Sequence, residues 1–93
     1  MSLEPYEVAL NRSARRALAE TLPLDVAIGM SEFITGPLGE NPYRVGQQLH
    51  APAEGIYSAR VMRDWRVLYL IDDEHRLVTV LDVRHRRDAY RSP

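Results

Sequence analysis

Residues 56–83 read IYSARVMRDWRVLYLIDDEHRLVTVLDV, and this stretch decides the fold. Its β-branched and aromatic residues form three runs, separated by the polar segments Arg63-Asp64 and 72–76. Such runs predict strands at 56–62, 65–71 and 77–83. Because the connections are short, consecutive strands must be antiparallel, and the stretch predicts a three-stranded meander.

Parity along the strands predicts which side chains share a face of the sheet, because successive side chains point to opposite sides. The odd positions are almost wholly apolar and should face the helices: Tyr57, Ala59, Val61, Trp65, Val67, Tyr69, Ile71, Leu77, Leu81 and Val83. The even positions include Arg60, Arg66 and Arg84. Arg60 and Arg66 share a face only if their hairpin loop has an odd number of residues, as a three-residue turn at 62–64 would have; a two-residue loop would separate them.

The N-terminal half predicts one strand and two helices. Residues 6–10 alternate weakly and lead into Asn11, a favourable N-cap. A helix is expected at about 12–21, ended by Pro23, which should itself be the first residue of a second helix. The apolar stripe of that second helix is Val26, Ala27, Met30, Phe33, Ile34 and Leu38.

Residues 35–55 are rich in proline and glycine and predict an irregular connection. The expected fold class is therefore α+β: an N-terminal strand, a two-helix hairpin and a three-stranded antiparallel meander. The strands should form a four-stranded sheet with the helices on one face, followed by a short basic C-terminal turn or helix. Ninety-three residues suit one domain, 1–93.

Composition excludes several classes of protein. The chain has no cysteine, which rules out disulfide frameworks and thiolate metal sites. No stretch approaches the roughly 20 apolar residues of a membrane span, and the N-terminus lacks the pattern of a signal peptide, so a cytoplasmic protein without membrane contact is expected. All twelve basic residues are arginine, either from codon bias in a GC-rich genome or because arginine binds phosphate in a bidentate manner.

Charge is uneven along the chain although the formal net charge is only −1. Residues 1–55 carry four arginines against seven acids, whereas residues 56–93 carry eight arginines against six acids. If the strand ends and the C-terminal turn meet, they gather arginines, a histidine and a tyrosine: Arg60, Arg66, Arg84, His85, Arg86 and Tyr90. Three converging guanidinium groups suit a phosphate whose charge grows in a transition state.

His85 titrates nearest neutrality in this group, which makes it the acid or base candidate, and Tyr90 could stack on an RNA base. Each residue also has a structural interpretation. Arg66 could pair with Asp82 across the strands. His85 could be a surface residue, Tyr90 a packing lid, and Arg86, Arg87 and Arg91 a solvated tail. No histidine and carboxylate show a metal-ligand spacing, and no cofactor is expected.

The order of elements and several motifs resemble the RelE branch of the RelE/ParE toxin superfamily over nearly the whole chain. These motifs are Ala14-Arg-Arg-Ala-Leu18, Arg44-Val-Gly46, Gly55-Ile-Tyr-Ser-Ala-Arg60, Trp65-Arg-Val-Leu-Tyr69, Ile71-Asp-Asp-Glu-His75 and Val83-Arg-His-Arg-Arg-Asp-Ala-Tyr-Arg91. The resemblance implies the toxin of a type II toxin–antitoxin system. It further implies a metal-independent endoribonuclease that cleaves mRNA on the ribosome by attack of a 2′-hydroxyl on the adjacent phosphate. The cognate antitoxin would neutralise it in a hetero-oligomer.

Roles carried over by position make Arg66 the arginine at the scissile phosphate, Arg84 the transition-state arginine and Tyr90 the base-stacking tyrosine. Arg60 would help to neutralise the phosphate, and His85 lies one residue beyond the matched arginine. Expected RNA contacts are Ser58, Arg86, Arg87 and Arg91.

Two departures from relatives bear on activity: Ser58 and the residue after Gly46 stand where relatives carry lysine, which leaves the general base unassigned. Two alternatives therefore stay open. One is a ParE-like inhibitor of DNA gyrase without nuclease activity. The other is a degenerate toxin that only binds its antitoxin.

Overall fold

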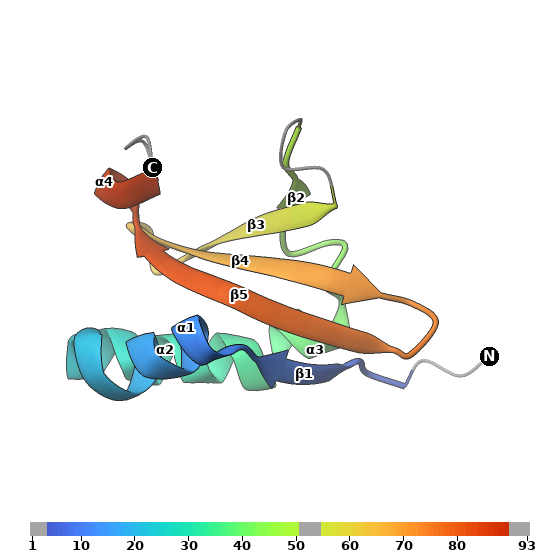
Figure 1. Cartoon of the computed structure of the whole chain (residues 1–93), viewed down its shortest axis with the longest axis horizontal. Coiled ribbons are helices and arrows are strands. Elements are labelled where there is room, and N and C mark those ends of the chain that lie inside the picture. The colour runs from blue at the N-terminus through green and yellow to red at the C-terminus, as the bar shows by residue number, and fades with distance from the viewer. Residues whose placement is uncertain (1–3, 51–54, 90–93) are drawn as a thin grey trace.

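A computed structural model of the chain describes residues 4–50 and 55–89 and contains a five-stranded mixed sheet in the order β1-β5-β4-β3-β2. The predicted meander is present as β3 (Ile56–Val61), β4 (Trp65–Asp72) and β5 (Leu77–His85), all antiparallel. The N-terminal strand β1 (Glu7–Leu10) pairs in parallel with β5. The α+β class is confirmed, and the helices of the N-terminal half form a layer against one face of the sheet (Figure 1).

The first predicted helix is present but changes its pitch. Asn11 caps α1 (Arg12–Arg16), since its side-chain oxygen accepts the backbone N–H of Ala14 at 2.9 Å. The chain then continues as a π-helix, η1 (Ala17–Thr21), which closes with a bond from the Leu22 N–H to the Ala17 carbonyl. Leu22 is extended because the following proline disfavours a helical residue before it.

The second predicted helix is α2 (Leu24–Thr35), with Pro23 as its N-cap rather than its first residue. Val26, Met30 and Ile34 are buried along one side of it, as the apolar stripe predicted. The connection that follows is more regular than expected. It contains the short helix α3 (Pro37–Glu40), which buries Leu38, and the two-residue strand β2 (Gln47–Gln48).

The expectation of a four-stranded sheet is therefore wrong by one strand. Strand β2 pairs with β3 through Gln47 opposite Ser58 and Gln48 opposite Tyr57. Two exposed glutamines carry no alternating pattern, so only the partner strand defines this element. At the other end of the chain, α4 (Arg86–Ala89) confirms the short basic C-terminal helix.

The face expected for Leu77 and Leu81 is also wrong. Leu68 of β4 lies opposite Asp82, but the next residue, Tyr69, lies opposite Val80, so β5 carries one extra residue at this bulge. The extra residue reverses the alternation along β5. Even-numbered side chains face the helices before the bulge, and odd-numbered side chains face them after it. Val78 and Val80 are accordingly buried before the bulge, and Val83 after it.

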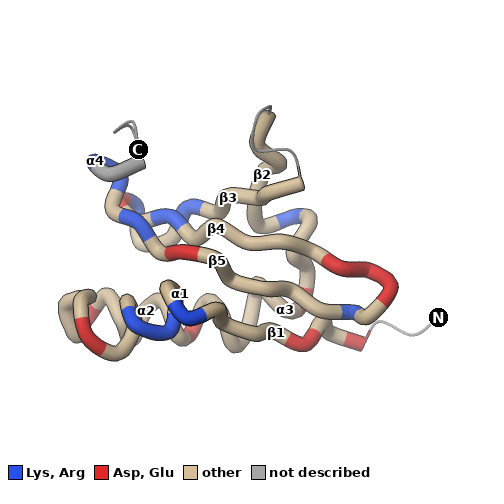
Figure 2. The backbone as a smooth tube through the Cα atoms, viewed as in Figure 1, with Lys and Arg blue, Asp and Glu red and all other residues tan. Residues whose placement is uncertain are grey.

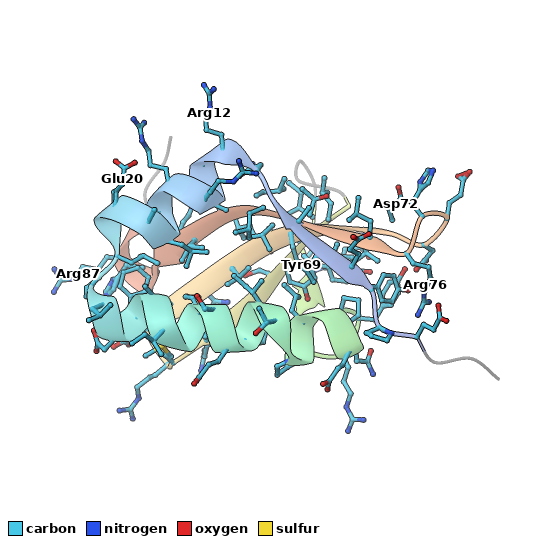
Figure 3. All side chains as sticks on the ribbon, turned by 90° about the horizontal axis from the view of Figure 1, so that it is seen from below. Arg12, Glu20, Tyr69, Asp72, Arg76 and Arg87 are labelled. Carbon is cyan, nitrogen blue, oxygen red and sulfur yellow. The ribbon has the colours of Figure 1, made fainter. Side chains whose placement is uncertain are left out.

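The core lies between the helix layer and the sheet, and the remaining face predictions hold there. Ala59, Val61, Val67 and Tyr69 are buried at odd positions of β3 and β4. Tyr69 is inaccessible to solvent and lies inside the molecule in Figure 3. Within the described residues, no helix is long and apolar enough to cross a membrane.

Candidate phosphate-binding site

Three arginines form a row across the central strands. Arg60 of β3 lies directly opposite Arg66 of β4, and Arg66 lies directly opposite Arg84 of β5. The row exists because Val61 pairs with Trp65, which leaves the three-residue loop that the shared face required. Like charges opposite one another destabilise a sheet. The arrangement therefore has a local cost that a bound anion would offset.

The row points away from the helix layer, because its members alternate with the buried Ala59, Val67 and Val83. Arg60 and Arg84 are exposed, whereas Arg66 is half-buried between them. The Arg66 guanidinium donates to the hydroxyl of Ser58 at 3.5 Å, the long limit of a hydrogen bond. Ser58 is buried beside the row and contributes a neutral donor and acceptor there.

Two recesses meet at Arg60 and Arg66. The larger, of about 300 Å³, is lined by Arg44, Val45, Gly46, Gln47, Ser58, Arg60 and Arg66. The smaller, of about 80 Å³, is lined by Arg60, Arg63, Asp64, Arg66 and Arg86. The shared pair of guanidinium groups thus faces a groove with further arginines on both sides.

Arg44 reaches the larger recess because the segment 41–46 is fixed to the sheet. The buried hydroxyl of Tyr69 donates to the Pro42 carbonyl at 2.6 Å, and burial raises the pKa of this phenol to about 12. Gly46 lies so close to that hydroxyl that a side chain at this position would overlap it. The absence of a side chain at 46 therefore lets the segment pack on the sheet beside Arg60 and Arg66.

Arg84 forms an ion pair with Asp82, the residue that was expected to pair with Arg66. Its Nε lies 2.7 Å from Oδ2 of Asp82, two residues back on the same face of β5. The proposed Arg66–Asp82 pair is absent, because the register places Asp82 opposite Leu68. Arginine has five N–H donors, so a contact at Nε orients the Arg84 guanidinium and leaves its outer edge for an anion.

His85 is next to the row in sequence but not in space. It is half-buried opposite Trp65, and the two rings meet edge to face with centroids 5.0 Å apart. Its Nδ1 accepts the backbone N–H of Arg87 at 3.2 Å. His85 follows Arg84 by one residue and therefore points to the opposite side of the strand, and it lines neither recess.

The C-terminal helix brings one further arginine to the row. The Arg86 backbone N–H donates to the Asp64 carbonyl at 2.7 Å, and its guanidinium lines the smaller recess. Arg87 is exposed and lines neither recess, and it lies at the opposite end of the molecule from Asp72 and Arg76 (Figure 3). Tyr90 and Arg91, both expected at the site, fall outside the described residues.

The two ends of the sheet carry opposite charge (Figure 2). Arginines gather where the β3–β4 turn meets α4, and acids gather at the β4–β5 turn, where Asp72 ends β4 and Asp73 and Glu74 follow it. A hydrogen bond from His75 lowers the pKa of Asp72 and so favours its charged form. A molecule with a net charge of only −1 thus presents a concentrated positive end.

A larger recess, of about 480 Å³, lies on α1 and is lined by Arg12, Arg15, Arg16, Ala19 and Glu20. Arg12 and Glu20 project outward there (Figure 3). Arg16 pairs loosely with Glu20, and Arg15 donates to the Leu10 carbonyl. We place the candidate site at the arginine row, where arginines of three adjacent strands lie opposite one another and Arg86 of α4 lines the smaller recess. Arg84 completes the row but lines neither recess.

Four polar or charged lining residues escaped prediction from the sequence: Arg44, Gln47, Arg63 and Asp64. Arg63 and Asp64 lie in a turn, where strand parity does not apply. Arg44 belongs to the Arg44-Val-Gly46 motif, in which Gly46, two residues further along, was a usable signal of close packing. Among the described residues, no three His, Asp or Glu side chains are grouped as a metal site.

Comparison with known proteins relates the chain to bacterial toxins. Residues 30–90 match the family model described as the ParE toxin of the type II toxin–antitoxin system parDE. The chain is 42% identical over 87 residues to Toxin RelE of Mycobacterium tuberculosis, and this alignment covers 94% of this chain and 88% of the relative. It is 44% identical over 87 residues to Toxin RelG of the same organism, covering 94% and 98% of the two chains.

The fold has a close counterpart among solved structures. A chain in the crystal structure of the toxin–antitoxin complex RelBE2 from Mycobacterium tuberculosis superimposes with a TM-score of 0.85 at 41% identity, covering 91% of this chain and 95% of that one. The residues matched by the family model contain the arginine row, Arg44 and α4.

Proposed function

The chain belongs to the RelE/ParE superfamily of toxins from type II toxin–antitoxin systems, and on this basis we propose that it is an mRNA endonuclease that acts on the ribosome. The observation that carries the proposal is the row of Arg60, Arg66 and Arg84 beside a groove. Guanidinium groups bind phosphate oxygens in a bidentate manner, and several of them suit a phosphodiester better than a neutral ligand.

The proposed reaction is an internal transfer at one phosphate. The 2′-oxygen of the preceding ribose forms a bond to phosphorus while the bond from phosphorus to the 5′-oxygen breaks. The products are a 2′,3′-cyclic phosphate and a 5′-hydroxyl, and the proton of the 2′-hydroxyl is transferred away as the 5′-oxygen gains one. Negative charge grows on the phosphate oxygens in between, where Arg66 would bind them with Arg60 and Arg84 on either side.

The proposal assigns the row to charge stabilisation rather than to proton transfer. Arginine keeps its proton near neutrality, and the chain has no lysine. His85 stays a proposed acid or base, although reaching the row would require it to leave Trp65. We further propose that Tyr90 stacks on a base and that Ser58, Arg86, Arg87 and Arg91 contact the RNA backbone.

A cognate antitoxin is the second proposed partner. The similar chain at a TM-score of 0.85 was solved in a toxin–antitoxin complex. We propose that this chain likewise forms a hetero-oligomer with its own antitoxin.

Expression without antitoxin tests the proposal directly. Growth should stop, and mapping of mRNA 5′ ends should reveal new ends inside coding regions. Arg66→Ala should lower cleavage by about 10²- to 10³-fold, the effect of losing one preorganised donor. Arg12→Ala on α1 is the matched control and should stay toxic. DNA damage without new mRNA ends would indicate a gyrase inhibitor instead, and a harmless folded product would indicate a module that only binds antitoxin.

A further inference from the structure

The loop between β3 and β4 adopts a conformation that its residues disfavour. Met62 and Arg63 have φ values of 54° and 70°, although neither is glycine, asparagine or aspartate. Left-handed residues in hairpin turns are normally glycine, asparagine or aspartate. Such outliers persist only where the surroundings hold them, and they cluster at functional sites.

Contacts on both sides hold this loop in place. Met62 packs on α2 at Gly29, where a Cβ would collide with the methionine sulfur. Asp64 donates its backbone N–H to the Met62 carbonyl at 2.7 Å and accepts the Arg86 N–H at its own carbonyl, also at 2.7 Å. The loop therefore connects the helix layer to α4.

The loop conformation places one carboxylate among four arginines. Asp64 lines the smaller recess together with Arg60, Arg63, Arg66 and Arg86, and among the described residues it is the only acid that lines either recess at the row. Its Oδ1 lies 3.8 Å from Nη1 of Arg86, a long ion pair between side chains that are 46% and 62% exposed. Exposed ion pairs contribute little stability, so this one can be exchanged readily for another anion.

From this geometry we infer that Asp64 is an internal counter-ion that competes with RNA phosphate for Arg86. The inference rests on the proposed function and adds a positioning residue to it. In the free protein the carboxylate holds the Arg86 guanidinium beside the row, and the carbonyl holds the start of α4. When RNA binds, a phosphate oxygen replaces the carboxylate at Arg86, while the carbonyl contact keeps α4 in place.

The same carboxylate could instead act as the general base for the 2′-hydroxyl. The contacts favour the counter-ion role, because Asp64 lies in the smaller recess on the far side of Arg60 and Arg66 from Ser58 and Arg44. The two roles predict opposite effects when the charge is removed. Loss of a counter-ion strengthens binding, whereas loss of a base abolishes cleavage.

The test uses Asp64→Asn, which keeps the backbone contacts and the side-chain shape. The probe is a short 2′-O-methyl RNA, which cannot be cleaved by 2′-oxygen attack. At low salt the variant should bind about two- to fivefold more tightly than the unchanged protein, because loss of an exposed ion pair frees Arg86. The slope of log K against log salt should steepen by up to roughly 0.7, the value for one phosphate neutralised on a single strand, because the Asp64 charge no longer offsets that of Arg86 beside the RNA.

Two controls separate local competition from net charge. Glu74→Gln removes one negative charge in the β4–β5 turn, at the other end of these strands from Asp64, and should leave the slope unchanged. In an Arg86→Gln background, Asp64→Asn should lose most of its effect. Equal affinity and slope in Asp64→Asn and the unchanged protein would overturn the inference, as would normal RNA binding with cleavage abolished.

Titration with inorganic pyrophosphate, followed through the arginine Nε–H signals in NMR, separates this inference from the proposed nuclease. Tighter pyrophosphate binding by Asp64→Asn together with no RNA cleavage by the unchanged protein would uphold the counter-ion and reject the nuclease. Equal pyrophosphate binding would reject the counter-ion whatever the RNA result.

Discussion

At the scale of single residues, Tyr69 fixes the segment that carries Arg44. Tyr69→Phe should lower the free energy of unfolding by about 1–3 kcal/mol, because the buried Pro42 carbonyl loses its donor. Urea unfolding measures this change. Arg44→Ala is the matched control: it should weaken RNA binding and leave stability nearly unchanged. A Tyr69→Phe protein as stable as the unchanged one would show that the hydroxyl contact contributes nothing.

Gly46 packs against the same hydroxyl and permits no side chain. A Cβ there would overlap the Tyr69 oxygen and come within 2.9 Å of the Ser58 carbonyl, which belongs to the sheet and cannot move freely. Gly46→Ala should therefore cost about 1–3 kcal/mol, as overpacking does. Gly55→Ala makes a useful comparison, because φ is +87° there but the space is open, so only backbone strain is added. Normal stability of Gly46→Ala would contradict the close packing.

At the scale of elements, the β3–β4 turn should gain stability when its strain is relieved. Arg63 adopts φ 70°, which costs an L-residue roughly 1–2 kcal/mol and costs glycine nothing. Arg63→Gly should therefore raise the melting temperature by about 4–8 °C, the shift for about 1 kcal/mol in a domain of this size.

Arg63→Ala separates strain from charge at this position. It removes the same guanidinium but keeps a side chain at positive φ, so it should not gain the stability of Arg63→Gly. Both variants should weaken RNA binding to a similar extent, because both remove one lining arginine. Equal melting temperatures of Arg63→Gly and Arg63→Ala would show that the turn is not strained.

The length of the β3–β4 turn decided how much of the site could be predicted from the sequence. Parity predicted the arginine row conditionally, and the condition held because the Val61–Trp65 pair closes a three-residue loop. Parity failed for Leu77 and Leu81, because a bulge depends on packing between strands and leaves no local signature. Strand β2 and Arg44 escaped for a related reason: their positions come from contacts with distant segments.

At the scale of the whole molecule, one carboxylate joins three distant segments at the acidic end of the sheet. Tyr6, before β1, and Tyr43, beside Arg44, both donate their hydroxyls to Asp73 in the β4–β5 turn. Arg76 lies 4.1 Å from the centre of the Tyr6 ring. The hydrogen bond to Asp73 raises the pKa of Tyr43 to about 12. A turn thus holds each end of the sheet through polar contacts. The β3–β4 turn does so at the arginine end through Asp64, and the β4–β5 turn does so at the acidic end through Asp73.

This cluster should make stability depend on pH in the acid range. The hydroxyls of Tyr43 and then Tyr6 lower the pKa of Asp73, so the folded protein binds the Asp73 proton more weakly than the unfolded chain does. Its contribution is present above the ordinary aspartate pKa of about 3.9 and is lost as pH falls through the lowered value. Asp73→Asn should reduce stability at pH 6 and then lose less of it on acidification than the unchanged protein, as measured by urea unfolding at both ends of the range. Asp25→Asn, on the exposed side of α2, should retain the normal decline, and an equally steep decline in Asp73→Asn would mean that the tyrosine contacts are not formed in solution.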